Sequence, residues 1–300
     1  MNEIFEALLD TEALQVFLHF DGPAYLFAVL VILVLAKLLY DLFTPYKLNR
    51  QMSEVDNKAV AVSFGGYLFA IGIVVYGVFT SVPGEWFVTS RRELLLDLLD
   101  LIIWSAIGIV LLNVARVIND RILLRKFRNV KELIEDRNIG TGAVEWGSYI
   151  GSAFIIKAAL FGEDISFLHG VVATLIYFFI GQLGFILFGW LYQAISRYDV
   201  HAEIERDNVS AGVAFGAGLI AISLLLSGFI IRYDSLLGFV AWLILSLFFL
   251  LVSRYLVDKF IIPGALLDEE ISQDQNWGAA FVEGSVAIVL ALLMVQAFLG

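Results

Sequence analysis

Hydrophobic residues of this chain gather in long, nearly uncharged stretches that are separated by short polar segments. A membrane-spanning helix needs about 20 mostly apolar residues, and eight stretches reach that length. The pattern therefore predicts eight transmembrane helices. Their approximate ranges are 24–44, 58–80, 95–118, 139–161, 168–194, 209–231, 235–257 and 277–299.

A short polar phrase occurs four times, each time where a loop enters one of these apolar stretches. The copies are Asp56-Asn57, Asp136-Arg137-Asn138, Asp207-Asn208 and Asp274-Gln275-Asn276. Asp and Asn are favoured helix N-caps, because their side chains accept hydrogen bonds from the free backbone N–H groups of the first turn. The functional alternative is that the four helix N-termini converge on a polar cytoplasmic vestibule that binds an ion or a partner.

Small residues recur at fixed distances after each asparagine of the phrase. The fourth residue is Ala61, Gly142, Gly212 or Ala280. The eighth is small in three copies, Gly65, Gly216 and Gly284, and is Trp146 in copy 2. Positions four apart lie on one helix face, and small residues there let helix backbones approach closely in lipid. The sequence therefore predicts that the second, fourth, sixth and eighth spans pack tightly in the interior and that the other four surround them.

The seventh residue after the asparagine alternates between two types, Phe64 and Phe215 in copies 1 and 3 and Glu145 and Glu283 in copies 2 and 4. Two nested duplications explain this pattern. We therefore expect an all-α polytopic membrane protein with two similar four-helix halves, each made of two parallel two-helix repeats. The expected divisions are an N-terminal interfacial segment, 1–23, and membrane domains at 24–161 and 162–300.

Glu145 and Glu283 are the candidate ion or proton sites. Each lies two turns into its span and toward the small-residue face. A carboxylate in the apolar region is costly and usually marks an ion or proton pathway, or a buried partner. The structural alternatives are a protonated glutamate that hydrogen-bonds across helices, and a glutamate that remains at interface depth.

Composition and net charge indicate the class of protein and argue against some kinds of partner. Of 300 residues, 60% are hydrophobic and 16% charged, against about 25% charged in soluble domains, and the mean hydropathy is +0.86. With no cysteine and three scattered histidines, we expect no disulfide, metal centre or cofactor. The net charge of −11 argues against a nucleic-acid partner.

Lys and Arg mark the cytoplasmic side of a membrane protein. The loops after spans 1, 3, 5 and 7 hold 14 of them and the opposite side holds Arg91, Arg92 and Arg232. Both termini should therefore face outside, with all four phrases in the cytoplasm. The 14 are Lys47, Arg50, Lys58, Arg116, Arg121, Arg125, Lys126, Arg128, Lys131, Arg137, Arg197, Arg206, Arg254 and Lys259.

Two further spacings surround the phrase. Glu132, Glu203 and Glu270 each precede the phrase aspartate by four residues, whereas copy 1 has Met52 there. Three odd-numbered spans end in a basic residue followed four later by an aspartate, which suits an ion pair on one helix face. These pairs are Lys37/Asp41, Arg116/Asp120 and Arg254/Asp258.

The repeated phrases resemble those of the bacterial inner-membrane proteins gathered as domain-of-unknown-function family 350, which includes the YjfL-like proteins. The resemblance rests on Asp56-Asn57-Lys58-Ala59 with Gly65-Gly66, and on Asp207-Asn208 with Gly212 and Gly216. It covers about residues 20–300 as two tandem domains. It implies a bacterial inner-membrane location, and some members are encoded near membrane-stress proteins, but it implies no particular activity.

Two functional hypotheses follow. In the first, the bundle is a small-ion or proton channel or transporter, and Glu145 and Glu283 bind the ion or proton. In the second, it is a non-transporting scaffold that recruits a cytoplasmic membrane-stress protein through charged loops around 119–138 and 258–276. The expected partners also include the lipid bilayer and further copies of the chain. We expect no enzyme, because the sequence contains no nucleophile–base arrangement.

Overall fold

A computed structural model describes residues 21–81, 90–126, 128–161, 166–233, 235–264 and 266–300. The predicted interfacial segment falls mainly on residues 1–20, outside the described residues. In the described ranges the regular structure is entirely helical. Seven of these helices are long and apolar enough to cross a membrane, so the chain is a multi-pass, all-helical membrane protein.

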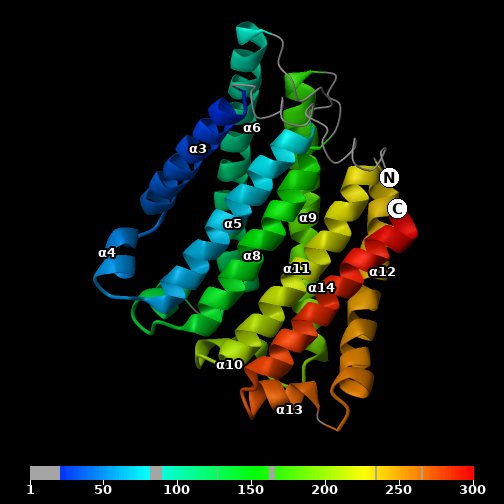
Figure 1. Ribbon diagram of the computed structural model, residues 1–300. Helices are drawn as coiled ribbons and strands as arrows, with labels where there is room; N and C mark the ends of the chain where they lie inside the picture. Colours follow the sequence, from blue (N-terminus) through cyan, green and yellow to red (C-terminus); the bar gives the residue numbers. More distant parts are fainter. Residues whose placement is uncertain (1–20, 82–89, 127, 162–165, 234, 265) are drawn as a thin grey trace, which may run out of the picture.

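A short helix follows every second long helix, and the short helices lie at one end of the molecule (Figure 1). The helices occur in the order α3 (Asp21–Phe43), α4 (Leu48–Ser53), α5 (Lys58–Ser81), α6 (Arg91–Ile118), α7 (Asn129–Ile134), α8 (Ile139–Ala159), α9 (Phe167–Ile195), α10 (Val200–Glu205), α11 (Val209–Arg232), α12 (Leu236–Leu256), α13 (Leu267–Ser272) and α14 (Trp277–Leu299). Single π-helical segments, η2 (Asn119–Leu123) and η3 (Val257–Ile261), extend α6 and α12.

The helix that follows each asparagine phrase belongs to one layer. In this layer, called the front row below, α5, α8, α11 and α14 lie side by side in that order (Figure 1). Behind it, α6 packs on α5 and α8, α9 on α8 and α11, and α12 on α11 and α14. The first helix, α3, packs on α5 and α6 at the α5 end.

The prediction that the even-numbered spans form a surrounded interior is therefore wrong. Only α8 and α11 have front-row neighbours on both sides, while α5 and α14 stand at opposite ends. Burial follows this order, because 83% of the apolar window of α11 is buried but only 39% of that of α14. Small residues allow close approach on a helix face, but they do not make a row close into a ring.

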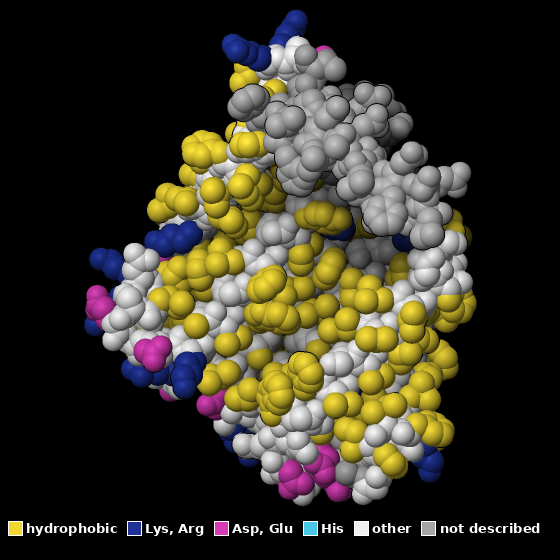
Figure 2. Space-filling model, viewed as in Figure 1, with side chains coloured by type: hydrophobic (Ala, Val, Ile, Leu, Met, Phe, Trp, Pro, Cys, Tyr) yellow, Lys and Arg dark blue, Asp and Glu magenta, His cyan; other side chains and the backbone are white. Residues whose placement is uncertain are grey.

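The exposed face of the front row is largely apolar, and charged side chains gather toward the end that carries the short helices (Figure 2). Buried hydrophobic residues form two clusters, one around α3, α5 and α6 and one around α9, α11, α12 and α14. Side chains of α8 enter both clusters, so this helix joins the two halves of the molecule.

Candidate functional site

Each asparagine of the repeated phrase caps the front-row helix that follows it. The side-chain oxygen accepts from the backbone N–H three residues later, at 3.2 Å for Asn57, 2.8 Å for Asn138, 3.2 Å for Asn208 and 3.1 Å for Asn276. The residue before each asparagine has a positive φ between 48° and 61°. Asp tolerates this left-handed conformation at turns, and Arg137 and Gln275 adopt it in copies 2 and 4. The phrase therefore encodes one turn geometry four times.

The amide nitrogens of the first three asparagines also join neighbouring repeats. Asn57 Nδ2 donates to the Leu133 carbonyl at 2.8 Å, Asn138 Nδ2 to the Ile204 carbonyl at 2.6 Å, and Asn208 Nδ2 to the Ile271 carbonyl at 2.7 Å. These three asparagines are at most 1% exposed. Asn276, in the last copy, is exposed.

Each asparagine has a second side-chain partner within its own turn. Asn138, Asn208 and Asn276 donate to Glu132, Glu203 and Glu270, and Asn57 donates to Gln51 at 3.1 Å. Copy 1 therefore also has a side-chain partner for its asparagine. Counting four residues back from the aspartate missed this partner, because that count gives Met52. Counting back six residues from the asparagine, as in copies 2 and 4, finds Gln51.

The phrase aspartates have less uniform surroundings. Asp207 accepts from the backbone N–H groups of Ile139 and Gly140 at 2.8 and 3.4 Å, so it caps the neighbouring helix α8. Asp136 pairs with Lys131 at 2.5 Å, while Asp56 and Asp274 are exposed. The four helix N-termini lie along a row rather than around one vestibule (Figure 1), so the predicted convergence is wrong.

The predicted small residues of copies 2 to 4 lie where front-row helices touch, whereas those of copy 1, Ala61 and Gly65, share the face of α5 that has no front-row neighbour. A Cβ at Gly142 would lie 2.6 Å from the Ala59 carbonyl oxygen, and one at Gly216 would lie 2.7 Å from that of Ala143. Gly212 faces the Gly140 backbone, Gly284 faces Ala217, and Ala280 is fully buried. Ala61 is half-buried.

Gly65 lies beside open space, because a Cβ there would meet nothing within 4 Å. The close contact belongs to the next residue, Gly66, where a Cβ would lie 2.5 Å from Trp146 Cα. The prediction that Gly65 packs inside the chain is wrong, because α5 is an end helix and this face has no neighbouring helix.

Glu145 and Glu283 are both buried within the helical layers. They are 4% and 5% exposed, on α8 and α14. The helix α11 lies between α8 and α14, so the two carboxyl groups belong to separate clusters. Each has one oxygen with no hydrogen-bond partner in the described structure, Oε1 of Glu145 and Oε2 of Glu283.

The first cluster contains Glu145, Arg116, Asp120 and Tyr40. The Ser63 hydroxyl donates to Glu145. The Arg116 guanidinium lies 5.3 Å from the centre of the Tyr40 ring, and its Nε is 3.9 Å from Asp120. Arg116 also lies within electrostatic range of Glu145. One guanidinium therefore faces two carboxyl groups.

The second cluster contains Glu283, Arg254, Asp268 and Tyr192. Arg254 Nε lies 3.3 Å from Glu283, and its Nη2 donates to Asp268 at 2.8 Å. The guanidinium lies 4.9 Å from the centre of the Tyr192 ring. The ion pair predicted with Asp258 is replaced by these contacts, because Asp258 accepts from the Leu267 backbone N–H at 2.8 Å.

A small cavity borders the second cluster. Its volume is about 30 Å³, and Tyr192, Ala214, Arg254 and Glu283 line it. On this measure a water molecule needs about 10–15 Å³ and two to four polar partners. The space therefore suits about two waters beside the Glu283 carboxyl group and the Tyr192 hydroxyl, which also has no hydrogen-bond partner in the described structure.

Sequence reasoning missed the arginines and tyrosines as members of these clusters. Arg116 and Arg254 are 138 residues apart, as are Glu145 and Glu283. Two pairs of tyrosines share one spacing, Tyr40 with Tyr46 and Tyr192 with Tyr198. An alignment of the two halves of the sequence at the spacing of the glutamates identifies the arginines as equivalent residues, and this signal could have found them.

Ionisable side chains outside the spans have pKa values shifted in different directions. Burial raises the pKa of Tyr198 to about 12, so its hydroxyl keeps its proton at neutral pH. Burial also raises the pKa of Glu132, although the Asn138 amide opposes this. Lys126, at 2.7 Å, lowers the pKa of Asp199. Among the described residues, no three His, Cys, Asp or Glu side chains form a group suited to a metal ion.

Comparison with known proteins matches one family model to the chain twice. The family model described as Domain of Unknown Function (DUF350) matches residues 15–160 and again 166–298. A "UPF0719 transmembrane protein" of Aquifex aeolicus (strain VF5) is 24% identical over 273 residues, which cover 87% of this chain and 96% of the relative. No solved structure has significant similarity to the chain.

A shorter relative is the "UPF0719 transmembrane protein YshE" of Bacillus subtilis (strain 168). It is 25% identical over 118 residues, which cover 39% of this chain and 87% of the relative. Less than half of the present chain therefore matches almost the full length of this relative.

Proposed function

The chain belongs to the family described as Domain of Unknown Function (DUF350), with two tandem copies of its domain, and we propose that it is a proton channel or transporter of the bacterial inner membrane. Glu145 and Glu283 are its two proton-binding groups, one in each copy. We propose no enzymatic reaction for it.

The charge count of the buried clusters carries this proposal. In the first cluster the guanidinium of Arg116 faces the carboxyl groups of Asp120 and Glu145. With all three ionised, the cluster holds one negative charge in excess. An uncompensated charge is costly in a low-dielectric interior, and binding one proton removes it.

The second cluster gives the same count. Arg254 pairs with Asp268 at 2.8 Å and with Glu283 at 3.3 Å. One guanidinium group and two carboxyl groups again leave one negative charge in excess. The equal result in both copies favours a function in which each copy takes up one proton.

The arrangement favours a proton over a metal cation. The Arg254 guanidinium lies 3.3 Å from the Glu283 carboxyl oxygen, where it would repel a cation that approached the same oxygen. A proton can bind the free Oε2 of Glu283 while Arg254 keeps its contacts with Asp268 and the Ser196 hydroxyl, at 2.8 and 2.9 Å. The arginine then never loses its counter-ion.

The proposal includes eight spans and a parallel repeat architecture. The helix α8 is the span that does not rank among the seven apolar candidates. It has 21 residues, the same as α12, and packs between α5 and α11. Its four glycines, Glu145 and Lys157 lower its hydropathy, and neighbouring helices shield these residues from lipid. The equivalent π-helical ends of α6 and α12, η2 and η3, support duplication of a four-helix unit.

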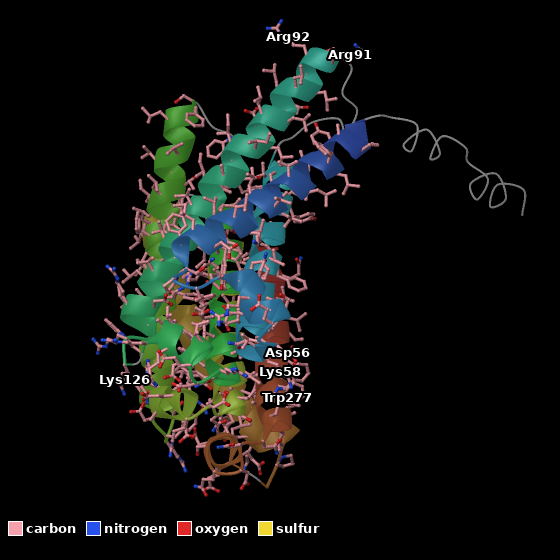
Figure 3. The ribbon with its side chains drawn as sticks, turned by 90° about the vertical axis from the view of Figure 1, so that its left-hand side faces the viewer. Asp56, Lys58, Arg91, Arg92, Lys126 and Trp277 are labelled. Carbon is pink, nitrogen blue, oxygen red and sulfur yellow. The ribbon has the colours of Figure 1, made fainter. Side chains whose placement is uncertain are left out.

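The proposed orientation puts the short helices in the cytoplasm and both termini outside. The 14-to-3 distribution of Lys and Arg supports it. Lys58 and Lys126 lie toward one end of the molecule, and Arg91 and Arg92 lie at the other (Figure 3). Each glutamate is then two turns from the cytoplasmic end of its helix, within reach of protons from that side.

Proton flux in proteoliposomes tests the proposal. The native chain, driven by a pH gradient with a potassium–valinomycin counter-flux, should acidify the lumen faster than empty liposomes. The double variant Glu145→Gln/Glu283→Gln keeps side-chain volume and hydrogen bonding but binds no proton, so its flux should fall to the empty-liposome rate. Matched controls are Gln182→Glu, which adds an acid outside both clusters, and the size-exclusion profile of each variant.

The scaffold hypothesis is the second candidate, supported by the exposed charges of the short-helix end. The helix α13 presents Glu269, and the turn after it presents Asp274. Absence of proton flux in the native chain, with a partner recovered from native membranes that depends on residues 258–276, would favour the scaffold. Full flux in the well-folded double variant would reject Glu145 and Glu283 as the proton-binding groups.

A further inference from the structure

The front row has two open ends. Its inner joints, α5 with α8, α8 with α11 and α11 with α14, are made by equivalent residues of successive repeats. The outer face of α5 and the outer face of α14 have no front-row neighbour. If the same joint could form between two chains, these two faces are the ones that would meet.

A hydrogen bond from an asparagine amide to a carbonyl of the next repeat marks every inner joint. The acceptors are the carbonyls of Leu133, Ile204 and Ile271, each on a short helix and each directly after the acid that holds the asparagine. In copy 1 the equivalent residue is Met52, directly after Gln51. No front-row asparagine of the described chain precedes Met52, so its carbonyl has no such donor within the chain.

Close backbone contacts form the second part of each joint. The ninth residue after one asparagine opposes the eighth after the next, as in the pairs Gly66 with Trp146, Gly147 with Gly216, and Ala217 with Gly284. The fourth residue of one helix opposes the second of the preceding helix, as Gly142 opposes Ala59. The joint therefore has a fixed register.

The α5 end presents the receiving half of this joint without an occupant. Gly65 and Gly72 face open space, with nothing within 4 Å of an added Cβ. Phe69 and Tyr76, on the same stripe, are 66% and 58% exposed. The equivalent stripe of α11, which meets α8, is Gly216, Ile220, Ser223 and Ser227, and all four are buried.

The α14 end presents the donating half. The Asn276 amide is exposed and donates to Glu270 at 2.7 Å, and it has no carbonyl of a following repeat in the described chain. Gly278 and Val289 are exposed, whereas their counterparts in α5, Ala59 and Ala70, are fully buried against α8.

We infer that a second copy of this chain docks head-to-tail on the first, with the α14 face of one copy against the α5 face of the next. Asn276 of one copy then donates to the Met52 carbonyl of the other. Ala61 packs on Gly278 and Gly65 packs on Ser285, in the register of the inner joints. The contact continues the front row from one molecule into the next.

The features of these faces fit a protein neighbour better than lipid. Glycines on a transmembrane helix permit backbone approach by another helix, and acyl chains do not require them. In Figure 3, which looks at the molecule from the α5 end, Asp56 and Trp277 lie on the same side, with Trp277 somewhat lower. A further copy can therefore extend the row in the same orientation.

Cysteine cross-linking in native membranes tests this docking, and the natural chain contains no cysteine. The pair Ala61→Cys/Gly278→Cys places thiols at the positions that oppose each other at inner joints. Because the contact is heterologous and leaves a free end on each copy, mild oxidation should produce a ladder of dimers, trimers and larger species.

Two kinds of control distinguish the proposed docking from random collision and from symmetric association. Leu26→Cys/Leu237→Cys lies on exposed positions of α3 and α12, and it measures random collision. The single variants measure symmetric association. A ladder no stronger than the collision control would overturn the proposal, and so would an equal yield from either single variant.

Gly65→Leu in the cross-linking background separates docking from folding. Within one chain the new side chain enters open space. The thermal unfolding temperature of the detergent-solubilised monomer should therefore not fall. In the docked joint it meets the backbone of the second copy, and the cross-linked fraction should fall about tenfold, the change in an association constant that corresponds to about 1.4 kcal/mol. Gly65→Ala should retain most of the ladder, and an unchanged ladder with Gly65→Leu would contradict the proposed register.

Discussion

The two buried clusters contain equivalent residues but use them differently. In the second cluster Arg254 lies 3.3 Å from Glu283, beside a cavity of about 30 Å³. In the first, Glu145 accepts a hydrogen bond from the Ser63 hydroxyl, and Arg116 pairs with Asp120 at 3.9 Å. The position of Ser63, six residues after the asparagine of the preceding repeat, is Ala214 in the second half.

That exchange affects how each glutamate is held. Without a hydroxyl at residue 214, one carboxyl oxygen of Glu283 borders the cavity, and the arginine takes the other oxygen. A buried carboxyl group gains partners wherever they are nearest, because an unpaired one is expensive. The preceding repeat thus decides how each glutamate is held, although the glutamate and arginine themselves are common to both halves.

The largest expected effect is loss of an arginine. Arg254→Met leaves Glu283 and Asp268 without their shared counter-ion and should cost about 3–5 kcal/mol of unfolding free energy. Arg116→Met should cost less, because Arg116 makes the looser ion pair. Steric-trap unfolding in bicelles measures both. Adding Glu283→Gln to Arg254→Met should recover part of the loss, and equal costs for the two single arginine variants would remove the proposed distinction.

Next in size are the asparagines of the turns. Asn208→Ala removes a cap worth about 1 kcal/mol and leaves the buried Ile271 carbonyl unpaired, which costs a further 1–3 kcal/mol, roughly. Asn276→Ala removes the cap and an exposed hydrogen bond to Glu270, but no hydrogen bond to another repeat within one chain. Thermal unfolding of the monomer in detergent compares them, and an equal loss for both would show that the inter-repeat hydrogen bond contributes nothing.

The exchange between Ser63 and Ala214 should produce smaller changes of opposite sign. Ser63→Ala removes a hydrogen bond to Glu145, worth about 1.5 kcal/mol for a charged acceptor. Ala214→Ser should stabilise the chain, since its hydroxyl would reach the unpaired oxygen of Glu283. Equilibrium unfolding of the two variants and of the double exchange tests this, and a stability loss from Ala214→Ser would contradict it.

The smallest effect concerns the exposed ion pair of Lys126 with Asp199, which joins the two halves at 2.7 Å. Because the pKa of Asp199 is lowered in the folded chain, its contribution is present above the unfolded pKa and is lost as pH falls through the folded pKa. About half of each side chain is exposed, so Lys126→Gln should cost at most about 1 kcal/mol. Unfolding at pH 7 and pH 3 should show the full difference between native and variant at pH 7 and a smaller one at pH 3.

The sequence predicted the local features well, because they depend on a few neighbouring residues. The asparagine caps follow from one turn geometry, and the buried positions of Glu145 and Glu283 follow from helical spacing. The arrangement of the helices did not follow. Small residues at Gly142 and Gly212 indicate close approach, but not that the approaching helices form an open row.

The partners of the buried acids were also beyond the sequence reasoning. Arg254 lies four residues from Asp258, yet it pairs with Asp268 and Glu283. The choice depends on the π-helical segment η3 and on α13, which bring Asp268 back toward α12. Interactions within one helix can be read from spacing, whereas contacts through a folded loop require its three-dimensional path.

The central claim is that Glu145 and Glu283 bind and release protons while buried. Infrared difference spectroscopy of the native chain in lipid, titrated from acidic to alkaline pH, observes the carboxylic-acid carbonyl band directly. We predict a reversible band whose amplitude falls by about half in Glu145→Gln and in Glu283→Gln, and which is absent from the double variant. A spectrum in which the double variant keeps the full band, or in which the native chain shows no reversible change, would contradict the account.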